Sequence, residues 1–138
     1  MMAQEAIEFT DYYRCYVVGR KHVRVMGYAP KEPHHRRYEA ARNRAVPAAL
    51  VGRVTEGALA LCQALGYDLN TVEFAVRDGV PYAIDFMNCA PDADVASVGQ
   101  ENFDWIVRVM AEFLLERAKH PRPFEGLGTW PRLLGIAK

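Results

Sequence analysis

The chain has 138 residues, 51% of them hydrophobic, which suffices for one globular domain whose core needs neither disulfides nor a structural metal. Its 17 basic residues balance its 17 acidic ones, so the net charge excludes a global field of the kind that attracts nucleic acid or membranes. No apolar run approaches the roughly 20 residues of a membrane-spanning helix, no secretion signal opens the chain, and three widely separated cysteines predict reduced thiols. We therefore expect a cytoplasmic protein.

The first part of the chain contains three short runs that are rich in β-branched or aromatic residues and separated by turn-forming residues. These predicted strands are Ala3–Phe9, Tyr13–Val18 and His22–Met26. Because no helical segment separates them, they indicate an antiparallel meander. The segment from Arg20 to Arg44 carries eight Lys or Arg residues and three of the four histidines. Prolines within it predict an exposed loop, and its charge predicts an anionic ligand nearby.

Two long helices are indicated by apolar residues at helical spacing. The first begins at Pro47 and is ended by Gly66, and the second runs from Asn102 to His120, before Pro121. The predicted buried stripe of the second helix is Ile106, Val109, Met110, Phe113 and Leu114. Residues 121–138 have no clear period, but their apolar side chains predict an extension that packs back on a domain formed by residues 1–120.

The most informative segment lies between the helices, from Thr71 to Asn88. Two β-rich runs flank Asp78-Gly79, a strong hairpin signal, and their apolar residues alternate so that Glu73 and Asp85 lie off the core. A two-residue turn would separate the two acids. A three-residue loop, Arg77 to Gly79, would bring them within roughly 6 to 8 Å of each other. We expect the three-residue loop because it keeps both apolar sets on one face.

Two carboxylates that meet on an open face repel each other, and a shared proton, a basic side chain or a divalent cation relieves the repulsion. Asn88 adds a neutral oxygen just beyond Asp85. Ligands that are all oxygen suit Mg²⁺ or Mn²⁺, particularly with phosphate oxygens completing the coordination. The alternative is that Glu73 and Asp85 are strand residues without a metal, paired to Arg77 or Arg14. Spacing alone leaves both interpretations open.

This hairpin resembles that of the ATP-grasp superfamily, in particular the branch of the ribosomal-protein glutamate ligases and glutathione synthetases. In that family an acid, a hairpin, a second acid twelve residues later and a following Asn bind magnesium on the nucleotide phosphates. Glu73, Asp85 and Asn88 fall on this pattern. The two acids are exchanged relative to the usual Asp and Glu, and Asn88 comes one place late, so a β-bulge near Met87 would be needed to aim it.

The N-terminal segment is similar to the family's hinge strand and the strand that follows. The resemblance implies that Gln4, Glu5, Ala6 and Ile7 meet the adenine edge of ATP and that Asp11 contacts the ribose. It also implies that Arg14 faces phosphate or the substrate carboxylate. The basic residue on the next loop would correspond to Arg36 or Arg37, and we take Arg37 together with Arg14 as the catalytic pair.

The resemblance implies an α+β fold: an antiparallel sheet of about five strands, two long helices on one face, and Glu73, Asp85, Asn88 and Arg14 on the open face. It implies the C-terminal catalytic subdomain of an ATP- and magnesium-dependent carboxylate-amine ligase that acts through an acyl phosphate, with the nucleotide lobe absent from this chain. The expected partners are ATP, a small carboxylate or amino acid, and either a second copy in a homodimer or the missing N-terminal lobe. The alternatives are a non-catalytic remnant or assembly domain, and a small metal-dependent binding protein unrelated to ligases.

Overall fold

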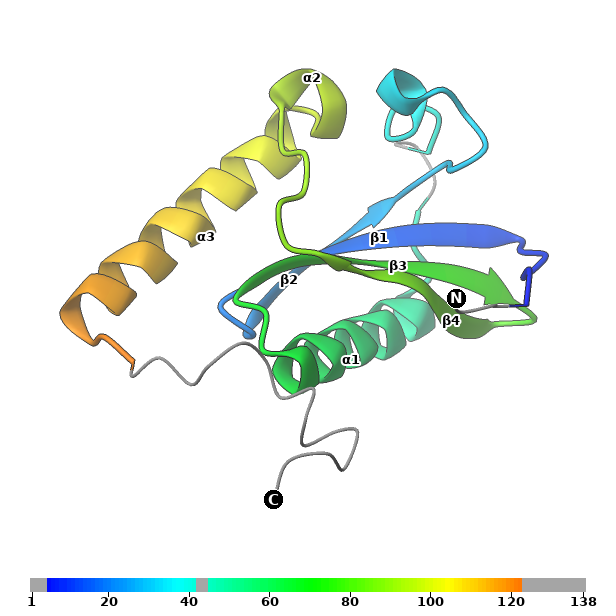
Figure 1. The fold of residues 1–138 in the computed structure, drawn as a ribbon. Coiled ribbons are helices and arrows are strands. Elements are labelled where there is room, and N and C mark those ends of the chain that lie inside the picture. The colour runs from blue at the N-terminus through cyan, green and yellow to red at the C-terminus, as the bar shows by residue number, and fades with distance from the viewer. Residues whose placement is uncertain (1–4, 42–44, 123–138) are drawn as a thin grey trace.

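The structure is a computed structural model that describes residues 5–41 and 45–122 (Figure 1). Its elements are β1 (Asp11–Val18), β2 (His22–Gly27), the 3₁₀ turn η1 (His34–Arg36), α1 (Ala48–Leu65), β3 (Leu69–Arg77), β4 (Val80–Asn88), α2 (Val95–Val98) and α3 (Gln100–Lys119). The predicted class, an α+β fold with an antiparallel sheet and two long helices, is confirmed.

The sheet has four strands in the order β2-β1-β3-β4, and every neighbouring pair is antiparallel. The segment that was expected to be a fifth strand, Ala3–Phe9, forms no strand over residues 5–9, and its first two residues lie outside the described part. The β1–β3 ladder begins at Asp11, paired with Val76, and the Thr10 N–H adds one bond to the Val76 carbonyl. Residues 5–9 therefore continue beyond the sheet without a partner strand.

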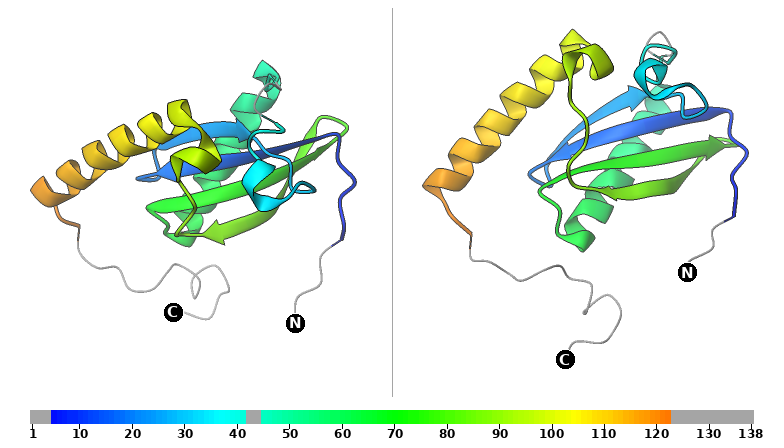
Figure 2. Two further views of the ribbon diagram at one scale, coloured as in Figure 1. Left: turned by 90° about the horizontal axis from the view of Figure 1, so that it is seen from above. Right: turned by 45° about the horizontal axis from the view of Figure 1, so that its top comes forward.

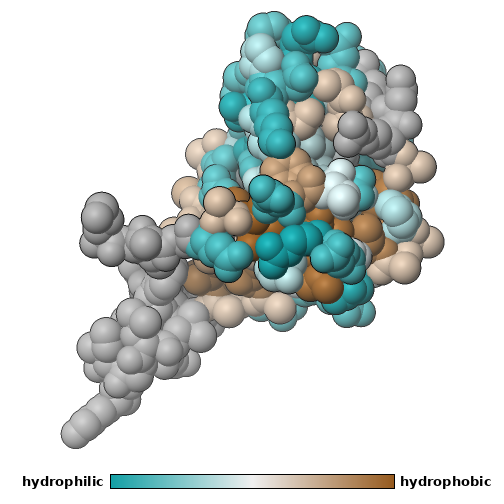
Figure 3. All heavy atoms as spheres, turned by 90° about the vertical axis from the view of Figure 1, so that its right-hand side faces the viewer, coloured by the Kyte–Doolittle hydropathy of each residue, from teal (hydrophilic) through white to brown (hydrophobic). Residues whose placement is uncertain are grey.

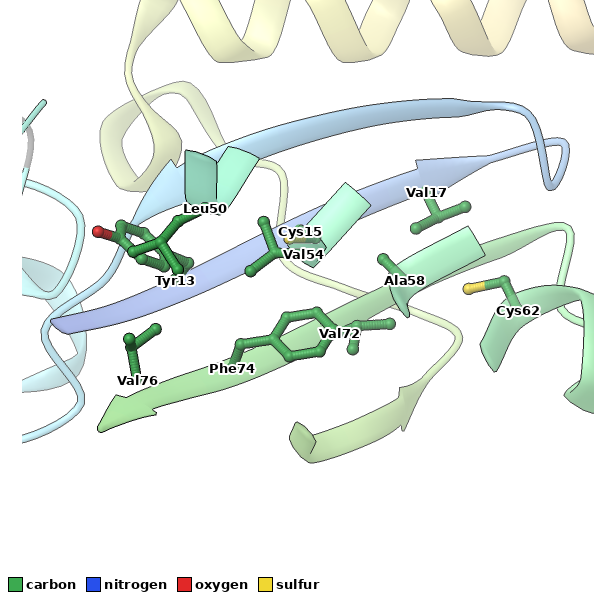
Figure 4. Packing of buried hydrophobic residues seen from close by; sticks show 10 residues of the cluster. All are labelled: Tyr13, Cys15, Val17, Leu50, Val54, Ala58, Cys62, Val72, Phe74 and Val76. Atoms are coloured by element: carbon green, nitrogen blue, oxygen red, sulfur yellow. The ribbon is translucent and has the colours of Figure 1, made fainter. Parts of the chain in front are cut away.

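Strand β1 lies between β2 and β3, so both of its edges are paired. Both of its faces are buried because α1 covers one face of the sheet and α3 contacts the other. Its odd-numbered residues face α1 and form the main core with β3 (Figure 4). The buried members of this core are Tyr13, Cys15, Val17, Leu50, Val54, Ala58, Cys62, Val72, Phe74 and Val76. The even-numbered residues of β1 face the other side of the sheet.

Helix α1 forms where the sequence indicated. Pro47 precedes its first residue, where the missing proline N–H costs nothing, and Gly66 ends it in the left-handed conformation with φ 80°. By length and composition alone, α1 is apolar enough to cross a membrane. In this fold the face that carries Leu50, Val54 and Ala58 packs on the sheet instead, as in the core helix of a globular domain.

Helix α3 lies on the opposite side of the sheet from α1, and not on the same face as was expected (Figure 1, Figure 2). The second core, on this side, contains Tyr12, Tyr16, Met26, Tyr28, Tyr38, Ala75, Val98 and Ile106. The physical reason is that β1 and β3 carry apolar residues on both faces, so each face needs a cover. The start of α3 is further held by Arg24, whose Nε donates to Asn102 at 2.8 Å.

The second half of α3 covers less of the sheet than the sequence predicted. Phe113 lies against Gly19 at the β1–β2 turn, and Arg117 forms an ion pair with Asp68 at 3.4 Å. Leu114, expected in the buried stripe, is 57% exposed. In this half of α3, Phe113 and Arg117 make the contacts to the rest of the domain, and the neighbouring Leu114 faces solvent.

Candidate metal and nucleotide site

The turn between β3 and β4 has two residues and not three. Arg77 pairs with Val80, and both Asp78 and Gly79 are left-handed, with φ values of 53° and 72°. This is the geometry of the tight hairpin turn that Asp-Gly favours. The expected three-residue loop is therefore wrong. The tight Asp78-Gly79 turn matches the twist of the strands, and the apolar residues of β4 divide between the two faces, with Phe86 on the main core and Ile84 on the second core.

Irregularities within the strands bring the two acids together. Phe74 pairs with Ala83, but the next pair is Glu73 with Asp85, so Ile84 is the extra residue of a β-bulge. Directly opposite residues share a face, which places Glu73 and Asp85 side by side. Ile84 packs on the second core, whereas Ala83 packs on the main core.

A second irregularity lies between this pair and the end of the hairpin. Thr71 pairs with Asn88, so three residues of β4 span what two residues of β3 span. This is the bulge near Met87 that Asn88 was expected to need. Because Thr71 accepts a hydrogen bond from Arg14, its face is the face of Arg14 and Glu73, and the register places Asn88 on that face too.

Arg14 lies at the centre of this face but is not on an open surface, since it is only 5% exposed. Its Nη1 donates to the hydroxyls of Tyr38 at 3.0 Å and Tyr28 at 3.4 Å, and its Nη2 donates to Thr71 at 3.2 Å. Its guanidinium carbon lies 5.2 Å from the centre of the Tyr28 ring. The loop after β2 supplies both tyrosines and closes over a face that the sequence predicted to be open.

Glu73 is held from two sides. Tyr12 donates to its Oε2 at 2.8 Å, and Arg14 Nε lies 3.6 Å from its Oε1. Burial raises the pKa of the Glu73 carboxyl above its usual range, although the Tyr12 hydrogen bond and the Arg14 charge oppose that shift. Burial and the Glu73 carboxylate also raise the pKa of Tyr12 far above its ordinary value, so Tyr12 remains a hydrogen-bond donor.

Arg37 lies at the edge of the same cluster. Its Nη1 donates to the Tyr28 hydroxyl at 3.2 Å, and its Nε donates to the Glu32 carbonyl at 3.0 Å. The two predicted catalytic arginines, Arg14 and Arg37, therefore meet at one tyrosine. Arg37 is the more accessible of the two, while Arg36 is exposed in η1.

A cavity of about 410 Å³ adjoins this cluster and is lined mainly by apolar side chains. Its lining residues are Glu5, Ala6, Ile7, Phe9, Tyr12, Pro30, Lys31, Ala75 and Ile84. Figure 3 views the molecule from the end at which β1 begins, and hydrophobic surface (brown) shows there between hydrophilic groups (teal). Tyr12 lines the cavity and also binds Glu73, so the cavity and the acid pair are neighbours.

The remaining predicted site residues are placed less favourably. Gln4 lies outside the described residues. Asp11 is not part of the cavity lining; it alternates with Tyr12 along β1 and so lies on the face of α1. Its carboxylate accepts a hydrogen bond from Thr10 at 3.2 Å. The structure thus brings together Glu5, Ala6 and Ile7 at the cavity, and Arg14, Arg37, Glu73, Asp85 and Asn88 at the cluster.

Sequence reasoning missed the three tyrosines that hold the charged groups, Tyr12, Tyr28 and Tyr38. One signal could have found Tyr12: it is two residues before Arg14 on the same strand, so the two side chains must share a face. Tyr28 and Tyr38 lie on an irregular loop, and no periodicity predicts their orientation.

Glu73, Asp85 and Asn88 form a donor set made of oxygen atoms, as divalent cations such as Mg²⁺ require. Asp85 is exposed beside Glu73, and the Glu73 carboxylate has lone pairs besides the one that accepts from Tyr12. Within residues 5–41 and 45–122, no three His, Cys, Asp or Glu side chains gather in a metal-binding group. Two carboxylates and one amide oxygen fit a hard cation that takes its other ligands from phosphate and water, as Mg²⁺ does.

Comparisons with known proteins give one solved structure with the same fold. The chain is similar to D-alanine–D-alanine ligase from Bacillus anthracis, solved as a complex with ATP, with a TM-score of 0.58 and 18% identity. The similarity covers 85% of this chain and 42% of the ligase, so the chain spans less than half of that protein's length. No protein-family model and no curated protein matches the sequence.

Proposed function

We propose that this chain is the ATP- and magnesium-binding C-terminal subdomain of a carboxylate-amine ligase of the ATP-grasp superfamily. The observation that carries the proposal is the direct pairing of Glu73 with Asp85 beside an apolar cavity. The shared fold with a ligase solved in complex with ATP supports the same proposal. In this assignment the base of ATP occupies the cavity, and its phosphates reach the acid pair.

The residues take separate roles in this proposal. Glu73, Asp85 and Asn88 would hold Mg²⁺, which when bound supplies charge neutralisation on phosphate oxygens. Arg14 is buried, so it acts by fixing and neutralising Glu73 and does not itself reach a phosphate. Arg37, at the edge of the cluster, is the group that would contact the phosphate or the carboxylate substrate. Glu5, Ala6 and Ile7 would meet the base.

Calorimetric titration of the purified chain with ATP in the presence of Mg²⁺ tests this function. We expect binding in the wild type and at least a tenfold weaker affinity, about 1.4 kcal/mol, in Glu73→Ala and in Asp85→Ala. Glu56→Ala on the exposed side of α1 is the matched control and should bind as the wild type does. Absence of binding at millimolar ATP in the wild type would overturn the proposal.

A second candidate is a non-catalytic domain that keeps the nucleotide site without turning over ATP. The chain corresponds to 42% of the ligase's length. Catalysis of acyl phosphate formation needs groups on several sides of the phosphates, and one subdomain supplies one side. Phosphate release from ATP, measured with candidate carboxylates and amines, separates the two: steady turnover by the isolated chain excludes the non-catalytic candidate.

A further inference from the structure

The outer surface of α3 carries an apolar stripe that the sheet does not cover. Val107, Ala111, Leu114 and Ala118 follow one another at spacings of four, three and four residues, and all four are exposed. At 3.6 residues per turn this spacing places them in one line along the helix. We call these four residues the outer stripe. Leu115, 61% exposed, lies next to it.

The outer stripe is distinct from the face that anchors α3. Ile106 and Val109 are the buried residues that hold the helix to the body. Charged residues lie along one edge of the outer stripe, and they include Arg108 and Glu112, which form an ion pair at 3.5 Å. The apolar arc of α3 is thus wider than one packing face requires, and exposed Val107 and Leu114 remain on its free part.

We propose that the outer stripe is a self-association surface on which α3 of a second copy packs antiparallel, giving a two-fold symmetric dimer. A two-fold axis at Ala111 brings Val107 of one copy to the level of Leu115 of the other, and brings Leu114 and Ala118 to the levels of Arg108 and Asp104. Alanines at positions 111 and 118 let the two helix backbones approach, while Val107 and Leu114 fill the space on either side.

The charges of α3 favour this orientation. Its N-terminal part carries Glu101 and Asp104, and its last turn carries Arg117 and Lys119. Antiparallel pairing about Ala111 places Asp104 of one copy near Lys119 of the other, twice by symmetry. A parallel pairing would place like charges together. The two helix dipoles also oppose each other in the antiparallel arrangement.

Sedimentation equilibrium of the full chain tests the proposal. We expect a dimer in the wild type and at least a tenfold weaker association in Leu114→Glu. Val51→Glu is the matched control: Val51 is an exposed valine on α1, 37% accessible, and its substitution should leave the dimer intact. A monomeric wild type up to about 100 µM would overturn the proposal, and would favour the chain's own residues 123–138 or a separate domain as the occupant of the stripe.

Two further variants test the orientation of the helices and do not depend on losing apolar contact. Asp104→Lys should weaken the dimer, and the double variant Asp104→Lys/Lys119→Glu should restore it. In a Cys89→Ser background, which removes the exposed native thiol, Ala111→Cys at the two-fold axis should form an intermolecular disulfide under mild oxidation. Glu56→Cys on α1 is the control that should not. Equal cross-linking at both positions, or no restoration by the charge exchange, would exclude the antiparallel α3 interface.

Discussion

Arg14 shows how one buried guanidinium organises the site around the acid pair, whereas the sequence placed it on an open face. Its bonds to Tyr28, Tyr38 and Thr71 consume three donors, and its Nε faces Glu73 without forming a hydrogen bond to any described residue. The ion pair between Arg14 and Glu73 was the metal-free alternative left open by the sequence. The two interpretations are compatible, because a carboxylate paired on one side retains lone pairs for a cation on the other.

Replacing Arg14 by Met is expected to destabilise the fold strongly. The variant leaves Glu73 buried without its cation, and it removes the donors to two tyrosines, so we expect a loss of about 3 kcal/mol. Arg77→Met is the matched control, because Arg77 ends β3 at the surface, where its side chain is 39% exposed and its ion pair with Glu5 is 3.8 Å long. That control should change stability by about 0.5 kcal/mol or less. Urea unfolding monitored by circular dichroism measures both, and equal effects would contradict the buried role.

The pKa of Glu73 makes a prediction about pH. Because burial raises its pKa in the folded state, the folded chain holds this proton at pH values where the unfolded chain has lost it. The contribution of Glu73 to the stability of the fold is therefore complete below the pKa of the carboxyl in the unfolded chain, near 4.5. That contribution is lost as the pH rises through the higher pKa of the folded chain. Glu73→Gln cannot titrate, so its stability relative to the wild type should increase as pH is raised from 4 to 7. A constant difference across this range would show that the Glu73 pKa is not raised.

At the scale of elements, the sequence predicted helices and strands well because each is a local pattern. Periodicity, Pro47 and Gly66 placed α1 within a residue of its observed bounds. The position of the hairpin was also predicted correctly. Its register was not, because the turn has two residues and β-bulges farther along the strands bring the acids together. Burial favoured the three-residue loop because that loop would keep both apolar sets on one face. In the structure a tight turn followed by a bulge also brings Glu73 beside Asp85, and Ile84 packs on the other face.

Features that depend on tertiary contacts could not be predicted from the chain. The exposure of Leu114 follows from how far the sheet extends beneath α3, and the burial of Arg14 follows from the path of the loop that carries Tyr28 and Tyr38. A helical stripe indicates which residues can be buried, while the neighbouring element decides which of them are. The same limit explains why α3 was assigned to the face of α1.

The tight turn can be tested with two glycines that both face open space. Neither Gly79 nor Gly52 has an atom within 4 Å of an added Cβ, so Ala at either position meets no clash. Gly79 has φ +72°, where Ala is strained, and Gly79→Ala should destabilise the chain by roughly 1 kcal/mol. Gly52 lies within α1, and Gly52→Ala should stabilise it by about 0.5 to 1 kcal/mol. Thermal melts would reveal the opposite signs; the same sign for both would contradict the left-handed turn.

For the whole molecule, the arrangement divides the proposed ligand into two parts. The cavity is mainly apolar and lies toward the start of β1, whereas the acid pair lies farther along the sheet on the same face. Tyr12 stands between them and contacts both. A nucleotide that spans the two would gain apolar contact from its base and cation-mediated contact from its phosphates.

This division predicts that base and phosphate binding respond differently to the same substitution. Adenosine should bind the wild type weakly and without any dependence on Mg²⁺, because it engages the cavity only. ATP should bind more tightly, and Mg²⁺ should increase its affinity in the wild type but not in Asp85→Asn, which keeps the shape of the side chain and removes its charge. Adenosine should bind Asp85→Asn as it binds the wild type.

Calorimetric titrations with adenosine alone, and with Mg-ATP in competition with adenosine, measure the base contribution and the phosphate contribution separately. If Asp85→Asn weakened adenosine as much as Mg-ATP, the acid pair would belong to the base site or to the fold, and the two-part arrangement would be wrong.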